Sequence, residues 1–251
     1  MLAIRRLSKN FGGVQAVCDV DIEIEQGTIH SVIGPNGAGK TTLLNLVTGI
    51  YTPSGGDILL QGNSITALSP NQRAQRGMSR TFQNLQVCMN MSALENVMVG
   101  AHLRLNHGLL SGLLRSRALK AADAACRDEA VELMRFAGIG EHVGRAANEM
   151  SYGALKRLEI ARALAAHPAV LLLDEPAAGL NNTETRDLEL LIQKIAAQGV
   201  TVVLVEHDMK LVMGVSSRIS VLDYGKKLAE GTPEQVRANS DVIAAYLGPS
   251  I

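Results

Sequence analysis

The sequence of 251 residues is long enough to bury one large core, or a core with a smaller helical lobe. Lysine plus arginine and aspartate plus glutamate number 24 each, so the net charge is zero and no large basic surface for nucleic acid is indicated. No apolar run reaches the roughly 18 residues of a membrane-spanning helix, and no signal-peptide core follows Met1, so we expect a cytoplasmic protein.

The first part of the chain alternates apolar and polar residues, as strands do. Leu2, Ile4 and Leu7 begin this pattern, and residues 20–24 repeat it. Residues 57–60 resume a strand after a cluster of turn-forming residues, and residues 80–83 are expected to end another strand. The segments up to residue 60 predict a small antiparallel sheet beside the main core.

An aromatic residue, Phe11, lies between the first two predicted strands and is followed by two glycines. Its ring offers a flat face on which a nucleotide base could stack. A phenylalanine that packs in a core or a turn is an equally good interpretation of this position.

Residues 34–41 read Gly-Pro-Asn-Gly-Ala-Gly-Lys-Thr, a full match to the phosphate-binding pattern G-x-x-x-x-G-K-[ST]. The apolar residues 28–33 before it predict a buried strand, and residues 41–48 after it predict the first turns of a helix. Glycines let successive N–H groups point at an anion, and the helix dipole adds positive potential. The segment therefore predicts nucleotide binding.

Two side chains of this loop have distinct expected roles. Lys40 is expected to reach the β- and γ-phosphates of ATP, and the Thr41 hydroxyl is expected to ligate Mg²⁺. The remaining expected nucleotide contacts of the loop are Gly34, Asn36, Gly37, Ala38, Gly39 and Thr42.

Residues 92–148 differ from the rest because they are rich in alanine and leucine and poor in β-branched residues. They predict a helical lobe of about three helices. The apolar residues 109–114 within it predict a packed helix end, or alternatively a surface that faces a partner or a membrane.

From residue 149 onward, predicted strands and helices alternate. Ser151 precedes a helix predicted over 155–166, and an amphipathic helix is predicted over 183–198. Residues 169–173 and 200–205 are fully apolar and predict buried strands. This alternation implies an α/β fold with a parallel sheet that is covered on both faces.

Charged residues follow both of these apolar strands. Asp174 and Glu175 come at the carboxyl end of the first strand, where α/β sheets bind their ligands. Asp174 is suited to hold Mg²⁺ through water, and Glu175 to act as the general base for an attacking water. His207 follows the second strand and could contact the γ-phosphate. Solvated surface charges are the alternative for all three residues.

The ordered set of these features resembles the ATP-binding cassette family of transporter ATPases over nearly the whole chain. It consists of residues 34–41, Gln83, Met-Ser-Tyr-Gly-Ala at 150–154, Asp174-Glu175-Pro176, residues 178–181 and His207. Some stretches further resemble the cassettes of branched-chain amino-acid uptake systems, particularly the one with the longer insert: residues 108–114, 174–181, 206–213 and 231–234.

The resemblance implies a P-loop NTPase core with a mainly parallel sheet, an antiparallel β subdomain and a helical subdomain. Residues 1–91 and 149–251 would form the core with the β subdomain, and residues 92–148 would form the helical subdomain. Together they would make a single ATPase domain.

The resemblance also implies a head-to-tail dimer of cassettes with two ATP molecules at the interface. Each site would take the phosphate loop and the groups Asp174, Glu175 and His207 from one chain, and Ser151 and Gly153 from the other. Gln83 is expected to contribute to catalysis and to Mg²⁺ binding, from a loop that couples the site to the membrane partner. Phe11 takes the position that stacks on adenine.

Three residues depart from the usual pattern of the family. Tyr152, Ala154 and Asn181 stand where glycine, glutamine and aspartate are usual. Tyr152 and Asn181 are at home in the branched-chain group, whereas Ala154 removes a polar side chain from the expected interface. We therefore expect weaker interfacial hydrogen bonding without loss of activity.

The implied function is ATP-driven import of branched-chain or related amino acids at the cytoplasmic face of the cell membrane. The implied partners are transmembrane permease subunits, a second cassette of the same or another kind, and indirectly an extracytoplasmic solute-binding protein, with no nucleic acid. Lipid or polysaccharide export, import of another amino acid, amide or urea, and a soluble cassette ATPase acting on ribosomes or DNA are the alternatives. A regulator without hydrolysis is disfavoured because Glu175 is intact.

Overall fold

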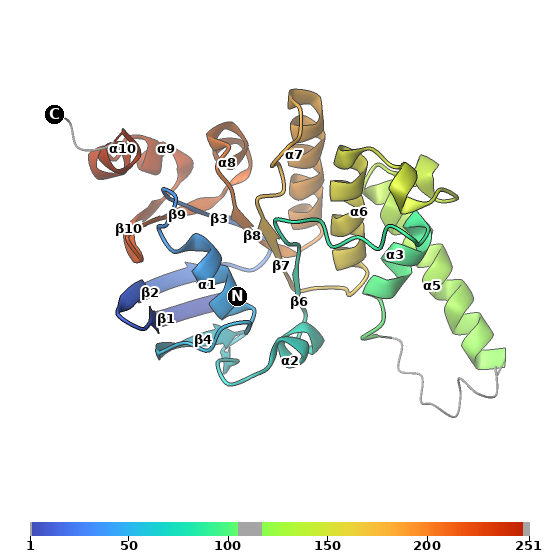
Figure 1. The fold of residues 1–251 in the computed structure, drawn as a ribbon, viewed down its shortest axis with the longest axis horizontal. Coiled ribbons are helices and arrows are strands. Elements are labelled where there is room, and N and C mark those ends of the chain that lie inside the picture. Colours follow the sequence, from blue (N-terminus) through green and yellow to red (C-terminus); the bar gives the residue numbers. More distant parts are fainter. Residues whose placement is uncertain (1, 105–116, 248–251) are drawn as a thin grey trace.

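The computed structural model describes residues 2–104 and 117–247, which form two sheets with helices around them (Figure 1). The smaller sheet is antiparallel, with the strand order β2-β1-β4-β5. The larger sheet has the order β10-β9-β3-β8-β7-β6. All neighbouring pairs of the larger sheet are parallel except β9 and β10. The predicted α/β fold with a mainly parallel sheet and a separate antiparallel sheet is confirmed.

The strands of the smaller sheet are β1 (Leu2–Phe11), β2 (Val14–Ile24), β4 (Gly55–Leu60) and β5 (Asn63–Ser64). Those of the larger sheet are β3 (Ile29–Ile33), β6 (Met78–Arg80), β7 (Val170–Asp174), β8 (Thr201–Val205), β9 (Arg218–Asp223) and β10 (Lys226–Gly231). The helices are α1 (Lys40–Val47), α2 (Pro70–Gln75), α3 (Ala93–Gly100), α5 (Arg117–Phe136), α6 (Tyr152–Leu164), α7 (Asn182–Ala197), α8 (Met209–Val215), α9 (Pro233–Arg237) and α10 (Ser240–Leu247).

The larger sheet is covered on both faces, as its apolar strands predict. Alternate residues of β7 point to opposite faces, because side chains alternate along a strand. Val170 and Leu172 pack with α1 and the smaller sheet, whereas Leu171 and Leu173 pack with α3, α5, α6 and α7. Helix α1 therefore lies between the two sheets, and its amino end meets the carboxyl end of β3 (Figure 1).

Helix α6 begins earlier than the sequence suggested. The Ser151 hydroxyl accepts a hydrogen bond from the backbone N–H of Ala154, at 3.3 Å, which makes Ser151 the N-cap and Tyr152 the first helical residue. The predicted start at residue 155 was wrong because the first turn, Tyr152-Gly153-Ala154, carries no strong helix-forming pattern.

The strand expected over residues 80–83 also ends earlier, at Arg80. The N–H of Thr81 still donates to Leu172 of β7 at 3.0 Å, but the N–H of Phe82 turns to the Glu159 carboxylate at 3.4 Å. Gln83 therefore lies in the loop that follows β6.

The described part of residues 92–148 contains α3, α5 and two short 3₁₀ segments, Gly140–His142 and Ala147–Glu149. The apolar stretch at 108–114 lies outside the described residues. None of the helices in the described ranges has the length and apolar character needed to cross a bilayer.

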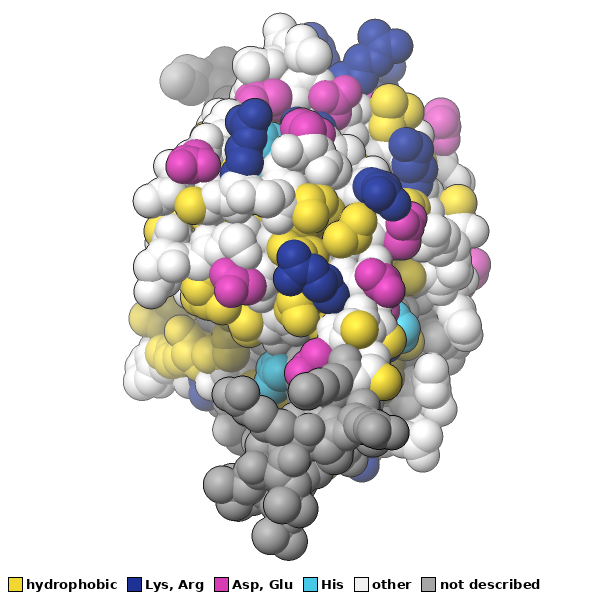
Figure 2. All heavy atoms as spheres, turned by 90° about the vertical axis from the view of Figure 1, so that its right-hand side faces the viewer, with side chains coloured by type: hydrophobic (Ala, Val, Ile, Leu, Met, Phe, Trp, Pro, Cys, Tyr) yellow, Lys and Arg dark blue, Asp and Glu magenta, His cyan; other side chains and the backbone are white. Residues whose placement is uncertain are grey.

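The face formed by α3 and α5 carries charges of both signs. Figure 2 looks at the molecule from this side and shows lysine and arginine side chains interspersed with aspartate and glutamate, around a small group of hydrophobic side chains. The described part of this face thus presents a mixed surface and no extended area of one charge sign.

Candidate functional site

The predicted phosphate loop connects β3 to α1 and requires glycine at two positions. Gly34 and Gly39 have φ angles of 151° and 101°. A Cβ atom on Gly34 would collide with the carbonyl oxygen of Leu222, and one on Gly39 would lie 2.5 Å from that of Ala16. The loop is therefore pressed against the backbones of β9 and β2, and only glycine permits this approach.

A second contact comes from the turn between β9 and β10. The N–H of Gly225 donates to the Ala38 carbonyl at 3.0 Å, and the Gly225 carbonyl accepts from the Cys18 N–H at 2.7 Å. The turn thus links the phosphate loop to β2. This support was not predicted from the sequence, although the glycine of the Tyr-Gly pair at 224–225 is a turn signal.

The Lys40 side chain is buried and lies across its own loop. Its Nζ donates to the carbonyl oxygens of Gly34 at 2.7 Å and Pro35 at 2.9 Å. Burial lowers the pKa of Lys40, and the nearby carboxylates of Glu175 and Asp174 oppose that shift. An ammonium group that is partly stripped of water gains from an anion such as a phosphate, because two neutral carbonyls compensate its charge incompletely.

A hollow of about 210 Å³ opens beside this loop. Its lining consists of Ala16, residues 36–42, Glu175 and His207. Most of the loop positions predicted to contact nucleotide therefore face one space together with two of the predicted catalytic residues. Gly34 is not in the lining, and Ala16 is a lining residue that was not predicted from the sequence.

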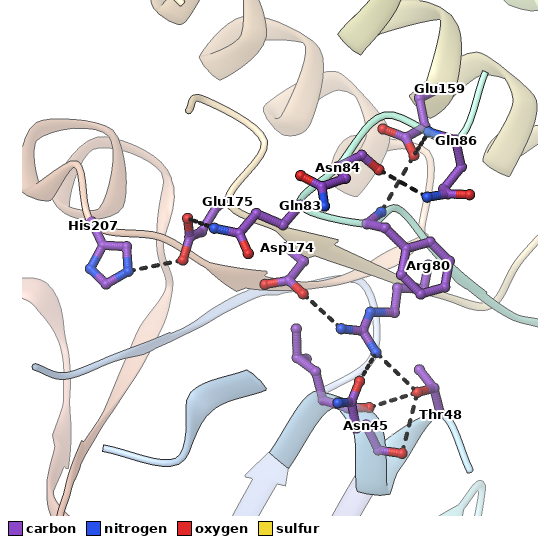
Figure 3. A network of polar contacts seen from close by, with 12 residues as sticks. Asn45, Thr48, Arg80, Gln83, Asn84, Gln86, Glu159, Asp174, Glu175 and His207 are labelled. Atoms are coloured by element: carbon purple, nitrogen blue, oxygen red, sulfur yellow. Dashed lines mark hydrogen bonds and ion pairs between the residues drawn. The ribbon is translucent and has the colours of Figure 1, made fainter. Parts of the chain in front are cut away.

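The three predicted catalytic side chains meet at Glu175, as Figure 3 shows. His207 Nε2 lies 3.0 Å from Glu175 Oε1, and Gln83 Nε2 donates to Glu175 Oε2 at 2.9 Å. These residues come from the ends of β7 and β8 and from the loop after β6, which the parallel sheet brings to one edge. Glu175 has a φ of 48°, a conformation uncommon outside glycine and often found at functional sites.

Asp174 is buried, and an arginine that the sequence analysis did not identify holds it. Arg80 Nη2 lies 2.7 Å from Asp174 Oδ2. Arg80 is the last residue of β6, adjacent to β7 in the sheet. An arginine at the end of a short strand was the available signal in the sequence.

The loop that carries Gln83 is attached to α6 by two buried charged residues. The Glu159 carboxylate accepts from the N–H groups of Phe82 at 3.4 Å and Gln86 at 3.3 Å, and Lys156 Nζ donates to the Gln83 carbonyl at 3.1 Å. Burial raises the pKa of Glu159, and the two N–H donors oppose this rise. The available signal in the sequence was that both residues lie on the otherwise apolar, buried face of α6.

Glu206 holds the carboxyl end of β8 in a similar way. Its carboxylate accepts from the N–H groups of Ala177 at 2.7 Å, His207 at 2.7 Å and Asp208 at 3.2 Å. The loop after β7 and the loop after β8 are therefore joined, and His207 starts from a fixed backbone position.

Ser151 and Gly153, the residues expected to act on a second chain's nucleotide, are not in the lining of the hollow. Ser151 is exposed at the start of α6, and Gly153 is covered by the Glu184 side chain. Ala154 is 2 % exposed and packs in the core. This side chain points inward because α6 starts at residue 152, and the expected weakening of interfacial hydrogen bonding stays a prediction.

Phe11 ends β1 with its ring 43 % exposed. The ring meets Tyr51 edge-on, with centroids 5.2 Å apart, and the Lys9 ammonium lies 4.9 Å from its centroid. The residue is therefore a surface aromatic and no core residue, although it is not in the lining of the hollow.

The three predicted Mg²⁺-binding residues offer suitable oxygen atoms. Thr41 is exposed at the start of α1, Gln83 bonds through its nitrogen and keeps its carbonyl oxygen, and only Oδ2 of Asp174 is bonded to Arg80. Mg²⁺ prefers such hard oxygen ligands and usually takes one or two carboxylates together with phosphate oxygens. In the described ranges no cluster of three or more His, Cys, Asp or Glu residues could hold a metal ion.

Comparisons with known proteins agree with this geometry. The model of the family described as ABC transporter matches residues 17–178, and that described as branched-chain amino acid ATP-binding cassette transporter matches residues 226–248. The high-affinity branched-chain amino acid transport ATP-binding protein LivG of Escherichia coli is 46% identical over 249 residues, covering 99% of this chain and 98% of the relative. The corresponding protein BraF of Pseudomonas aeruginosa is 45% identical, with the same coverage.

A solved structure gives the same result. The crystal structure of the ADP conformation of MJ1267, an ATP-binding cassette of an ABC transporter, superposes with a TM-score of 0.85 at 28% identity, covering 99% of this chain and 98% of that one. The family model matches more than half of the chain and the relatives match nearly all of it. The chain therefore belongs to the ABC transporter family, as one of its ATP-binding cassette ATPases.

Proposed function

We propose that the chain is the ATP-hydrolysing subunit of an importer for branched-chain amino acids. One observation carries the catalytic part of this proposal: Glu175 is held between His207 and Gln83 at the edge of the hollow that the phosphate loop lines. The similarity to LivG and BraF over nearly their whole length supports the solute class.

The proposed reaction is attack of water on the γ-phosphate of ATP. Lys40 and the N–H groups of residues 36–42 would bind the phosphates, and Thr41, Gln83 and Asp174 would hold Mg²⁺. When bound, Mg²⁺ neutralises charge that develops on the phosphate oxygens. Glu175 would accept the proton of the attacking water, while His207 and Gln83 keep its two oxygens oriented.

We propose that a second cassette completes each site. Ser151 and Gly153 are not in the lining of the hollow of their own chain, which supports contact with a nucleotide in another chain's hollow. Ser151 is exposed at a helix amino end, which favours a negatively charged group. We favour a partner cassette that is not identical to this chain.

The membrane partner would be a permease that docks beside the Gln83 loop. A groove of about 290 Å³ lies there, lined among others by Arg80, Phe82, Leu103 and Arg162. It lies between the loop after β6 and helices α3 and α6, so a segment bound in it would contact the loop that holds Gln83. The chain would work at the cytoplasmic face of the membrane through this contact, together with an extracytoplasmic solute-binding protein.

We further propose that the chain acts as a single ATPase domain. Residues 1–91 and 149–251 would provide the nucleotide-binding core with its β subdomain, and residues 92–148 the helical subdomain. One buried apolar cluster that contains residues of α3, α5 and α6 supports this proposal, because it joins the helical subdomain to the core.

Uptake of labelled solutes in cells that carry a single copy of the chain tests this proposal. Cells with the native chain are compared with cells carrying Lys40→Ala and, as a matched control, Lys194→Ala at an exposed position of α7. We expect Lys40→Ala alone to abolish uptake of leucine, isoleucine and valine, and to leave glutamate and urea uptake unchanged. Loss of a different solute would contradict the proposed substrate class, and unchanged uptake of the whole panel would contradict import of these solutes.

A further inference from the structure

The guanidinium group of Arg80, at the end of β6, contacts both β7 and the end of α1 (Figure 3). Its Nη2 lies 2.7 Å from Asp174 Oδ2. Its Nη1 donates to Asn45 Oδ1 at 2.7 Å and to Thr48 Oγ1 at 3.2 Å. Asn45 lies in the last turn of α1 and Thr48 caps its end, so Arg80 connects Asp174 to the helix that starts at the phosphate loop.

The pair of Arg80 and Asp174 is buried, with side chains 6% and 4% exposed. Burying two charges costs desolvation energy that their attraction often fails to recover, so stability alone explains such a pair poorly. The guanidinium is also planar and presents its N–H donors in a fixed arrangement. Nη1 and Nη2 are both occupied, which fixes the plane of the group, while Nε has no partner among the described residues.

This arrangement restrains the Asp174 carboxylate and leaves one of its two oxygens without a hydrogen bond to any described residue. Oδ2 is bonded to Arg80, whereas Oδ1 has no hydrogen bond within the described ranges. A carboxylate held by one oxygen presents the other in a constant direction. Oδ1 is therefore the oxygen available to a water ligand of Mg²⁺.

Arg80 also forms part of the wall of the groove beside the Gln83 loop. Its guanidinium carbon lies 4.9 Å from the centre of the Phe82 ring, and both side chains line the groove. Thr48 lines the same groove. The Arg80 side chain thus lines the groove and also contacts the Asp174 carboxylate.

We propose that Arg80 is a positioning residue that orients Asp174 for Mg²⁺ by anchoring it to the end of α1 beside the groove. This inference rests on the proposed ATP hydrolysis and names the residue that prepares its metal site. Arg80 is expected to touch neither ATP nor Mg²⁺, and to act only through Asp174.

Binding of the fluorescent nucleotide mant-ATP to the purified full chain tests this proposal. The dissociation constant is measured with Mg²⁺ and with EDTA for the native chain, Arg80→Met, Arg80→Lys and, as the matched control, Arg76→Met at an exposed position after α2. The ratio of the two constants gives the factor by which Mg²⁺ tightens binding.

We expect Arg80→Met to reduce this factor about 10-fold or more, as losses of residues that orient metal ligands do, with the EDTA value changed by no more than about 3-fold. Arg80→Lys should restore part of the factor, because a single ammonium keeps the charge but cannot bridge Asp174 and Asn45. Arg76→Met should match the native chain. The proposal would be overturned if Mg²⁺ tightened mant-ATP binding to Arg80→Met by the native factor, or if Arg80→Met lost as much affinity in EDTA as with Mg²⁺. It would also be overturned if Mg²⁺ had no effect on binding to the native chain.

If Arg80→Met does not fold, Asn45→Ala decides, because it keeps the ion pair and removes one anchor of the guanidinium. We expect a reduction of the Mg²⁺ factor by about 3-fold from the loss of one hydrogen bond, and an unchanged factor would overturn the proposal. The result does not depend on the transported solute, so failure of the uptake experiment and failure of this one are separate outcomes.

Discussion

Two neighbouring strands end in glutamates that are held in different ways. Glu175 follows β7, has a side chain 18% exposed, and is bonded to the side chains of His207 and Gln83. Glu206 follows β8, is 3% exposed, and accepts three hydrogen bonds from backbone N–H groups.

This difference in partners distinguishes Glu206, which holds backbone in place, from Glu175, which we propose as the general base. Backbone donors are fixed by the fold, so the carboxylate of Glu206 cannot leave them without disrupting two loops. The side-chain partners of Glu175 can turn away when water or phosphate enters the hollow. The same residue type at equivalent strand ends therefore has a structural role at Glu206, and at Glu175 the catalytic role that we propose.

The largest expected effect is on stability at Glu206. Glu206→Ala should lower the free energy of unfolding by about 4 kcal/mol, because three N–H groups near the sheet lose their acceptor. Urea denaturation followed by circular dichroism measures this. Glu206→Gln keeps one carbonyl oxygen and should lose about half as much. A stability loss below about 1 kcal/mol in Glu206→Ala would remove the distinction between the two glutamates.

His207→Ala should give the opposite result. We expect ATP hydrolysis to fall about 100-fold, because one orienting partner of Glu175 is lost. Stability should change by less than about 0.5 kcal/mol, since the His207 side chain is 41% exposed. Phosphate release and urea denaturation on the same preparation separate the two effects. If His207→Ala lost stability but kept the native rate of ATP hydrolysis, His207 would have a structural role, as Glu206 does.

His30 allows a test of how stability depends on pH, because it is a buried titratable residue that the proposed reaction does not use. It is buried in β3 with Nε2 2.9 Å from Ser220 Oγ, and burial lowers its pKa to about 4, with Arg218 and Lys227 acting in the same direction and Glu230 opposing. The unfolded chain takes up a proton near pH 6.5, so stability is present above that value and is lost as the pH falls towards 4.

Between pH 7.5 and pH 5 this loss should be about 2 kcal/mol. In His30→Gln the part of the acid destabilisation that His30 causes should disappear. Urea denaturation of both proteins at the two pH values gives the comparison, and an equal acid loss in both would show that His30 is not responsible.

Ser151→Ala should have the smallest effect on stability, about 1 kcal/mol, which is the usual value of an N-cap. If Ser151 also reaches the nucleotide of a second cassette, ATP hydrolysis by the assembled dimer should fall more than about 10-fold. Ser151→Asn, which also caps a helix, serves as the control because it should restore stability. If the rate of ATP hydrolysis changed in parallel with stability in both variants, the role of Ser151 would be limited to capping α6.

Much of the fold and site could be predicted because the signals are local in the sequence. The phosphate loop is one continuous segment, and Asp174, Glu175 and His207 directly follow apolar strands. Parallel strands then bring these ends to one edge of the sheet, so the meeting of Glu175 and His207 follows from the strand pattern.

The supporting residues could not be predicted, because their partners lie far away in the sequence. Arg80 and Asp174 are 94 positions apart, and Phe82 and Glu159 are 77 apart. A single sequence does not pair such residues. The error in the start of α6 has a different cause: its first turn, residues 152–154, carries no strong helix-forming pattern, so the predicted start lay three residues too late.

The most direct test of the central claim is hydrolysis by Glu175→Gln. The chain is purified from solubilised membranes with the proteins that it retains, and both ATP binding and phosphate release are measured. We predict that the variant binds ATP within about 3-fold of the native affinity but releases phosphate about 100-fold or more slowly, since an amide cannot accept the proton of the attacking water. Phosphate release at the native rate by Glu175→Gln would contradict the account.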